Sequence, residues 1–215
     1  MTETTPQETA IQTTILKCKT VKEYKRNLMQ MPVINGDIIL LGPVPENPEF
    51  CQLYKKWLEN ESIIKGTGDD KRAYTHEEVN LMFQEWKEDP EDFTLCIFEK
   101  ESNAPIGDIN LLDTVEFDDG PELKIMIGEK QGKGRGSEAM RLLLDYAFST
   151  IGLETINLSV YKDNIPAFSL FKKFGFNIIG EKTDSDNGKE EYVMKLRFNE
   201  FLGKNSHAGI INQII

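Results

Sequence analysis

A glycine-rich turn between a strand-like run and a long helical segment limits what this chain can fold into. The run is Leu123–Ile127, and the helical segment covers about Ser137–Thr150. Glycines at alternate positions leave main-chain N–H groups unshielded by side chains, and the following helix adds the positive end of its dipole. The segment between them therefore predicts an anion site for a phosphate or diphosphate. Its glycines are Gly132, Gly134 and Gly136.

This turn differs from two common phosphate-binding motifs. A P-loop needs Ser or Thr directly after Gly-Lys, but Gly134 follows Lys133. A dinucleotide fingerprint needs a glycine where Ser137 stands. A helix entry that binds no ligand stays open as the alternative. Lys133 and Arg135 favour a ligand, because they place positive charge in a chain with a formal net charge of −11.

The rest of the pattern predicts one mixed α/β (α+β) domain. Short turns between the middle strands favour antiparallel pairing, and a strand–helix–strand–helix unit follows them. We therefore expect a three-layer domain rather than a doubly wound parallel sheet. Thr75 and Glu78 predict a capping box, and Gly175 predicts a left-handed helix end. Strands are expected at 37–41, 93–99, 106–112, 123–127, 155–161, 178–182 and 190–198, and helices at 48–60, 75–90, 137–150 and 165–174.

The domain is expected to cover residues 31–200. Residues 1–30 are predicted to form an N-terminal extension, partly disordered because residues 1–15 are rich in Thr, Gln and Glu. A short amphipathic helix is expected within 19–30. Residues 201–215 are predicted to form a C-terminal tail.

Composition excludes several classes of function. A net charge of −11 opposes nucleic-acid binding; it suits a cationic partner, although ordinary solubility explains it equally well. No apolar run approaches the ~18 residues of a membrane span. The three cysteines are widely spaced, which indicates free thiols, no metal site and a cytoplasmic location.

Two sequence blocks carry a resemblance to a known family. Gln131, Gly134 and Gly136 match Q/R-x-x-G-x-G/A, which resembles the cofactor loop of the GNAT acetyltransferase superfamily, and the likeness continues through GKGRGSEAMRLLLDYAF. The second block is INLSVYKDNIPAFSLFKKFGF, at Ile156–Phe176. Upstream, APIGDINLLD resembles the RimJ/RimL branch, and the chain is also similar to eukaryotic N-acetyltransferases proposed to act on tubulin N-termini. The resemblance covers about Ile106–Leu196 and implies a mostly antiparallel sheet, splayed at the cofactor strand, with helices on both faces.

The resemblance also implies acetyl-CoA as co-substrate and maps its contacts. Backbone groups of the cofactor strand would hold the pantetheine arm, and N–H groups of the glycine turn would cradle the diphosphate. Asn164 would hydrogen-bond the pantetheine or phosphate side, and apolar side chains of the last helix would line the thiol end. The segment from Ile127 to Gln131 is one residue shorter than is common in the family, which predicts a reshaped bulge at the strand end near Gly128. The mapped residues are Ile125, Met126, Ile127, Gln131, Gly132, Lys133, Gly134, Arg135, Gly136, Ser137, Asn164, Ala167, Phe168 and Phe171.

Acetyl transfer to an amine needs a base, a donor for the carbonyl oxygen and an acid for the leaving thiol. A main-chain N–H of Met126 or Ile127 can serve as the donor. Glu122 is the first candidate for the base, with a solvated strand-end carboxylate as the alternative interpretation; Asp108 and Glu116 are weaker candidates. Many relatives place a tyrosine acid where this chain has Phe171, which cannot donate a proton. Tyr161 is the candidate for the acid, with Ser169, Tyr192 and water as alternatives.

Three functions follow as hypotheses. A free α-amine has a pKa of ~7.7–8.0 and is much more often neutral at pH 7 than a lysine at ~10.4. A site with no strong acid–base pair therefore favours a protein or peptide N-terminus. A small-molecule amine acceptor (polyamine, amino sugar or antibiotic) and a non-catalytic CoA-binding module are the alternatives. The chain is expected to act as a monomer or a homodimer.

Overall fold

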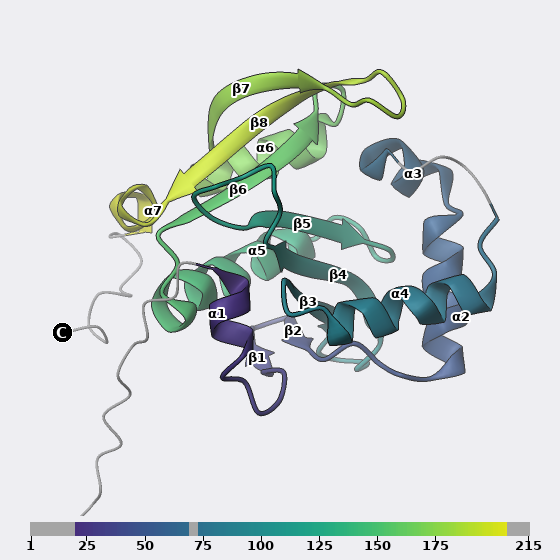
Figure 1. The fold of residues 1–215 in the computed structure, drawn as a ribbon. Helices are drawn as coiled ribbons and strands as arrows, with labels where there is room; N and C mark the ends of the chain where they lie inside the picture. Colours follow the sequence, from purple (N-terminus) through teal and green to yellow (C-terminus); the bar gives the residue numbers. More distant parts are fainter. Residues whose placement is uncertain (1–19, 69–72, 206–215) are drawn as a thin grey trace, which may run out of the picture.

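The computed structural model describes residues 20–68 and 73–205. One eight-stranded sheet runs through them (Figure 1), in the order β1-β2-β3-β4-β5-β6-β8-β7. Neighbouring strands pair antiparallel except β5 and β6, which are parallel. The predicted mixed and mostly antiparallel sheet is confirmed. The strands are β1 Ile34–Asn35, β2 Ile39–Gly42, β3 Asp92–Glu99, β4 Pro105–Leu112, β5 Glu122–Ile127, β6 Thr155–Tyr161, β7 Asn177–Thr183 and β8 Glu190–Arg197.

Helices cover both faces of this sheet, as the family resemblance implies. Figure 1 shows α2 and α4 on one face and α5 and α6 on the other. None of the helices in the described ranges is long and apolar enough to cross a membrane. The helices are α1 Val21–Lys25, α2 Pro48–Leu58, α3 Glu61–Thr67, α4 His76–Glu88, α5 Arg135–Tyr146, the π-helix η1 Ala147–Ile151, α6 Ile165–Phe174 and α7 Phe198–Asn205.

Alternation along the central strands builds two separate cores. On β3, Leu95 and Ile97 point into the core shared with α5, whereas Cys96 points into the core shared with α2 and α4. On β5, Leu123 belongs to the first core and Met126 to the second. Side chains of a strand alternate between faces, so both faces of the central strands are buried and three layers result.

Several local signals in the sequence are confirmed. Thr75 and Glu78 form the complete capping box at the start of α4. Gly175 ends α6 with φ 103°, in the left-handed region. β1, α3, η1 and α7 were not predicted. The packed part of the described chain also extends beyond the predicted 31–200, because Val21 of α1 is 0% exposed in the first core and Phe201 of α7 is buried there.

β5 and β6 are joined at one end and separate beyond it. A single residue pair, Glu122 with Asn157, links the two strands within the described chain. There, the Asn157 N–H donates to the Pro121 carbonyl at 2.9 Å, and its side-chain amide donates to the Gly120 carbonyl at 3.0 Å. A Cβ at Gly120 would lie 2.3 Å from the Thr155 carbonyl oxygen, so this close approach requires glycine. β5 stays paired with β4 along its length, and the predicted splay opens between β5 and β6 (Figure 1).

Glu138, in the first turn of α5, fixes this helix against the turn between β1 and β2. Its buried carboxylate accepts hydrogen bonds from the main-chain N–H groups of Asp37, of Ile38 at 3.0 Å and of Ile39 at 3.2 Å. One carboxylate therefore satisfies three consecutive main-chain donors, of which the Ile39 N–H is buried. The start of α5, and with it the glycine turn, is held at a defined place on the sheet.

We predict that Glu138→Gln lowers the free energy of unfolding by about 1.5–3 kcal/mol, the usual cost of losing hydrogen bonds to a charged acceptor. Urea unfolding followed by circular dichroism measures the change. Glu154→Gln is the matched control, because Glu154 is exposed. A loss no larger than that of the control would contradict the anchoring role.

Candidate active site

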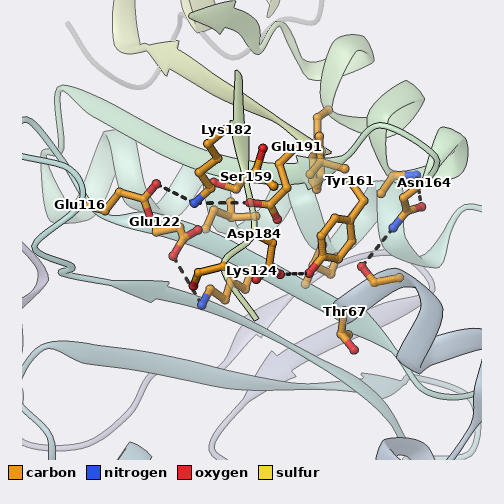
Figure 2. Close-up of a pocket in the computed structure, with 18 residues that line it drawn as sticks. Thr67, Glu116, Glu122, Lys124, Ser159, Tyr161, Asn164, Lys182, Asp184 and Glu191 are labelled. Carbon is orange, nitrogen blue, oxygen red and sulfur yellow. Dashed lines mark hydrogen bonds and ion pairs between the residues drawn. The ribbon is translucent and has the colours of Figure 1, made fainter. Parts of the chain in front are cut away.

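A continuous groove follows the gap between β5 and β6. Its first part, the loop cavity, has a volume of about 460 Å³ and lies beside the glycine turn. Its second part, the gap cavity, has a volume of about 550 Å³ and lies between the separated strands. Both are lined by Gly66 and Thr67 of α3, by Ile125 and by Asn164 and Ala167, so the two parts form one path. Figure 2 shows the gap cavity.

The glycine turn presents the start of α5 to the loop cavity. Gly134 precedes α5 with φ 82°, and no side chain in the described chain caps this helix. Gly132 has φ 81°, and a Cβ at either glycine would meet nothing within 4 Å. The uncapped N–H groups at the helix start are thus open to a ligand, which is the geometry of an anion site. Lys173 of α6 adds a positive charge nearby by donating to the Ser137 hydroxyl at 2.8 Å.

The structure brings most of the predicted cofactor residues to the groove. Ala167 lines both cavities, and Phe171 lines the gap cavity. Phe168 lines neither, because its ring packs against Tyr192 with centroids 5.2 Å apart. Lys133 and Arg135 line a separate surface cavity of about 500 Å³ beside Glu99. The other predicted residues that line the loop cavity are Ile125, Met126, Ile127, Gln131, Gly132, Gly134, Gly136, Ser137 and Asn164.

Asn164 has a structural role that the sequence analysis did not include. Its side-chain oxygen, Oδ1, accepts a hydrogen bond from the Ala167 N–H at 3.2 Å and so caps α6. Its side-chain nitrogen, Nδ2, donates to the Gly66 carbonyl at 3.4 Å, across the groove. Asn164 therefore joins α6 to α3 where the two cavities meet.

α3 forms the wall of the groove opposite α6, and the sequence analysis missed it. Three side chains from distant segments donate to carbonyl groups at its C-terminal end, which a short helix leaves unsatisfied. Local signals existed, since Asn60 caps the start of α3 and Gly68 ends it with φ 79°. The donors are Asn164 to Gly66, Asn187 to Gly68 at 3.2 Å and Lys189 to Lys65 at 3.2 Å.

Glu122 lies where β5 and β6 separate, and its side chain faces the gap cavity (Figure 2). It is 7% exposed, and the Lys124 ammonium lies 3.4 Å from its carboxylate. This ion pair shows that the two side chains share a face of β5. The Ser159 hydroxyl also lines the cavity and is buried without a hydrogen-bond partner among the described residues. A carboxylate and an unsatisfied hydroxyl therefore face the same space.

Charged side chains surround this space. Lys182 lies between Glu116, at 2.6 Å, and Glu191, at 3.4 Å. Asp108, a weaker candidate for the base, lines neither cavity. It is buried in the second core and accepts a hydrogen bond from the Tyr54 hydroxyl at 3.0 Å; burial raises its pKa to about 7.

Tyr161 is held by the turn between β7 and β8. Its hydroxyl donates to the Asp184 carboxylate and accepts a hydrogen bond from the Asn187 side chain at 3.0 Å. Burial, and after it the bond to Asp184, raises the pKa of Tyr161 to about 12. Tyr161 therefore lines the gap cavity, and its hydroxyl proton is in a hydrogen bond to the Asp184 carboxylate.

Comparison with known proteins bears on this geometry. The family model "Acetyltransferase (GNAT) domain" matches residues 39–177. An N-acetyltransferase 9-like protein from Caenorhabditis briggsae is 31% identical over 182 residues, which is 76% of this chain and 89% of the relative. The chain belongs to the GNAT acetyltransferase family. It is also 26% identical over 185 residues to human alpha/beta-tubulin-N-acetyltransferase 9, covering 78% of this chain and 86% of the relative.

The GNAT fold is also found among solved structures. A spermidine N-acetyltransferase from Vibrio cholerae, in complex with CoA and spermine, aligns with a TM-score of 0.67 at 18% identity, over 78% of this chain and 99% of that chain. As a GNAT protein the chain is an N-acetyltransferase, and this family uses acetyl-CoA. The enzyme interpretation therefore prevails over a non-catalytic CoA-binding module.

The groove fits this GNAT co-substrate. The start of α5 offers uncapped N–H groups beside glycines that leave open space. β5 leaves its second partner after one residue pair, so backbone groups of β5 beyond Glu122 have no strand partner on that side, and the Gln131 side-chain amide donates to the Ile127 carbonyl at 2.9 Å. These two features match the diphosphate and the amide-containing arm of CoA.

The hydrogen bonds of Tyr161 oppose an acid role in acetyl transfer. An ordinary thiol has a pKa of ~8.5, so protonating it from a phenol of pKa about 12 is unfavourable by a factor of more than ~10³. We interpret Tyr161 as a residue that holds the β7–β8 turn against the groove.

Tyr161→Phe is therefore predicted to keep kcat within about threefold, whereas loss of a true general acid costs ~10²–10⁴-fold. Stability is expected to fall by about 0.5–1.5 kcal/mol, because one net hydrogen bond is lost. Steady-state thiol release and thermal melting measure the two effects, with Tyr192→Phe as the matched control, because the structure places Tyr192, an alternative acid in the sequence analysis, outside both cavities. A hundredfold loss of kcat with an intact fold would restore the acid role.

Proposed function

We propose that the protein transfers the acetyl group of acetyl-CoA to the α-amine of a peptide or protein N-terminus, bound in the gap cavity. The charge of this cavity is the observation that supports the proposal. Its lining has four carboxylates and two lysine ammonium groups, a surplus of two negative charges beside the strand gap (Figure 2). Such a surplus suits one cationic or partly neutralised amine. The carboxylates are Glu116, Glu122, Asp184 and Glu191, and the lysines are Lys124 and Lys182.

In this proposal the chain holds acetyl-CoA along the loop cavity. The N–H groups from Gln131 to Ser137 receive the diphosphate at the start of α5. Backbone groups of Ile125, Met126 and Ile127 receive the pantetheine arm, and Ala167 and Phe171 provide apolar contact at the gap. When bound, acetyl-CoA supplies the thioester carbon that the amine attacks.

The chain's own groups then provide two of the three chemical needs. Glu122 receives the proton of the amine, directly or through one water, since its buried carboxylate faces the cavity. A main-chain N–H of Met126 or Ile127 donates to the carbonyl oxygen, on which negative charge develops. Water reaching the gap cavity protonates the leaving thiolate and gives the free thiol of CoA, because Phe171 has no proton to give.

The cavity favours an α-amine over other acceptors. A lysine side chain with a pKa of ~10.4 is neutral in less than about one part in a thousand at pH 7, whereas about a tenth of an α-amine is neutral. A polyamine carries several positive charges, whereas the cavity has a surplus of only two negative charges, which suits a single amine better. Lys182 also neutralises part of the charge of Glu116 and Glu191.

The relatives support a protein acceptor. The human relative at 26% identity over most of the chain is named for acetylating tubulin, whereas the spermidine enzyme at 18% identity supports only the fold. We also propose a cytoplasmic location, in line with Cys51 and Cys96, which are free and buried.

We predict that acetyl-CoA supports rapid acetylation of short peptides with a free N-terminus. N-blocked peptides that contain lysine, and spermidine, should react at least ~100-fold more slowly at pH 7, as the neutral fractions of the amines require. Thiol release, with mass spectrometry of the products, measures both the rate and the acetylated atom. Faster turnover of spermidine or of the blocked peptide would contradict the proposed acceptor.

Glu122→Gln is predicted to lower kcat/KM for the peptide by ~10²–10⁴-fold, the usual contribution of a general base. Acetyl-CoA binding should stay within about twofold, because Glu122 lies in the gap cavity and outside the loop cavity. Glu181→Gln is the matched control, since Glu181 is exposed on β7 and lines neither cavity. Equal rates for the two variants would remove Glu122 from the mechanism.

A further inference from the structure

Both ends of the glycine turn are tied to one carboxylate outside the groove. Glu99, the last residue of β3, is 6% exposed. It accepts hydrogen bonds from the ammonium of Lys130, from the guanidinium of Arg135 and from the Ser102 hydroxyl at 2.8 Å. Lys130 directly precedes the turn, and Arg135 is the first residue of α5. A single side chain therefore connects the two flanks of the turn to the central sheet.

The turn between Lys130 and Arg135 has several residues in the left-handed conformation and few packing contacts. Lys130 and Lys133 have φ values of 53° and 52°, in the left-handed region, which costs a non-glycine residue roughly 1–2 kcal/mol. Gly132 and Gly134 are left-handed as well, and the space around both is open. Strained backbone persists only where surrounding contacts fix it. The Gln131 side chain holds one end of the turn by donating to the Ile127 carbonyl at 2.9 Å, and the bonds to Glu99 fix Lys130 and Arg135 on either side of the two open glycines.

We propose that Glu99 is a positioning residue for acetyl-CoA: by fixing Lys130 and Arg135, it holds the glycine turn in its binding geometry before the co-substrate arrives. The proposal rests on the proposed placement of the diphosphate at the start of α5. A loop that is already ordered loses less conformational entropy on binding. The Lys130 and Arg135 bonds lower the pKa of Glu99 to about 2, so the anchor stays ionised at neutral pH.

The same contacts could instead weaken binding, by neutralising two cations that would attract a diphosphate. The positions of the Lys130 and Arg135 side chains argue against such a loss of attraction for the diphosphate. Neither Lys130 nor Arg135 lines the loop cavity. The Arg135 side chain is only 14% exposed and faces Glu99. The Arg135 charge is therefore neutralised by Glu99, and in the proposal the phosphates are bound by the main-chain N–H groups of the turn.

Glu99→Gln in the full chain tests the proposal. We expect the dissociation constant of acetyl-CoA, measured by isothermal titration calorimetry, to rise about tenfold as the charge-assisted bonds are lost. Amide hydrogen exchange of residues 130–137 in the free protein should become faster. At saturating acetyl-CoA, kcat and the KM of the amine should change less than about twofold. Glu99→Asp, which keeps the charge, should recover part of the affinity.

Two further variants separate the possible causes. Glu101→Gln makes the same change in net charge at an exposed neighbour and should leave affinity and exchange unchanged. Lys130→Met removes one anchor at an exposed position, so it keeps the test valid if Glu99→Gln fails to fold; it should weaken binding about threefold.

The outcomes are distinguishable. If the wild-type protein binds no acetyl-CoA, the proposed co-substrate site fails and the positioning role fails with it. If the wild type binds and Glu99→Gln binds equally well with unchanged exchange, only the positioning role is overturned. Tighter binding by Glu99→Gln would also overturn it and would show that Glu99 withholds positive charge from the ligand.

Discussion

The separation of β5 from β6 is the constraint on which the rest of the site depends. The two strands meet at Glu122 and Asn157 and are held there by the close approach of Gly120 to β6. Beyond that point β5 keeps β4 as a partner and loses β6. A sheet rarely leaves buried backbone groups without partners, so an open strand edge inside the molecule indicates that a ligand completes it. The groove, the position of Glu122 and the exposure of the glycine turn all follow from this opening.

The walls of the groove are held by polar contacts between segments far apart in sequence. The C-terminal carbonyl groups of α3 accept hydrogen bonds from Asn164, Asn187 and Lys189. Tyr161 ties the β7–β8 turn to β6 through Asp184. Glu99 likewise ties the glycine turn to β3, through Lys130 and Arg135. Each of these contacts connects a short or strained segment to a long strand or helix, so the site combines open space with fixed walls.

Local sequence signals predicted the elements whose ends are determined by nearby residues. The capping box of α4, the glycine that ends α6 and the glycine turn before α5 are examples, because each depends on residues within one or two turns. β5 and β6 were predicted for a similar reason, since their apolar residues form short runs between turns. The family resemblance supplied the splay at the cofactor strand and the helices on both faces of the sheet, which no local pattern contains.

Elements and contacts that depend on distant partners were not predicted. α3 has only seven residues, and the carbonyl groups of Lys65, Gly66 and Gly68 at its C-terminal end accept hydrogen bonds from side chains 98 to 124 residues later. Glu99 looked like an ordinary strand end, since its partners Lys130 and Arg135 are more than 30 residues away. The placement of Phe168 against Tyr192 also depends on how β8 crosses α6, which the spacing along α6 does not reveal.

A crystal structure of the protein with bound CoA is the most direct measurement of the central claim. We predict density for the diphosphate at the N–H groups of Gln131–Ser137 and for the pantetheine arm along β5, with its sulfur in the gap between β5 and β6. CoA bound elsewhere, or β6 paired with β5 along its full length in the complex, would contradict the claim that the strand gap is the active site.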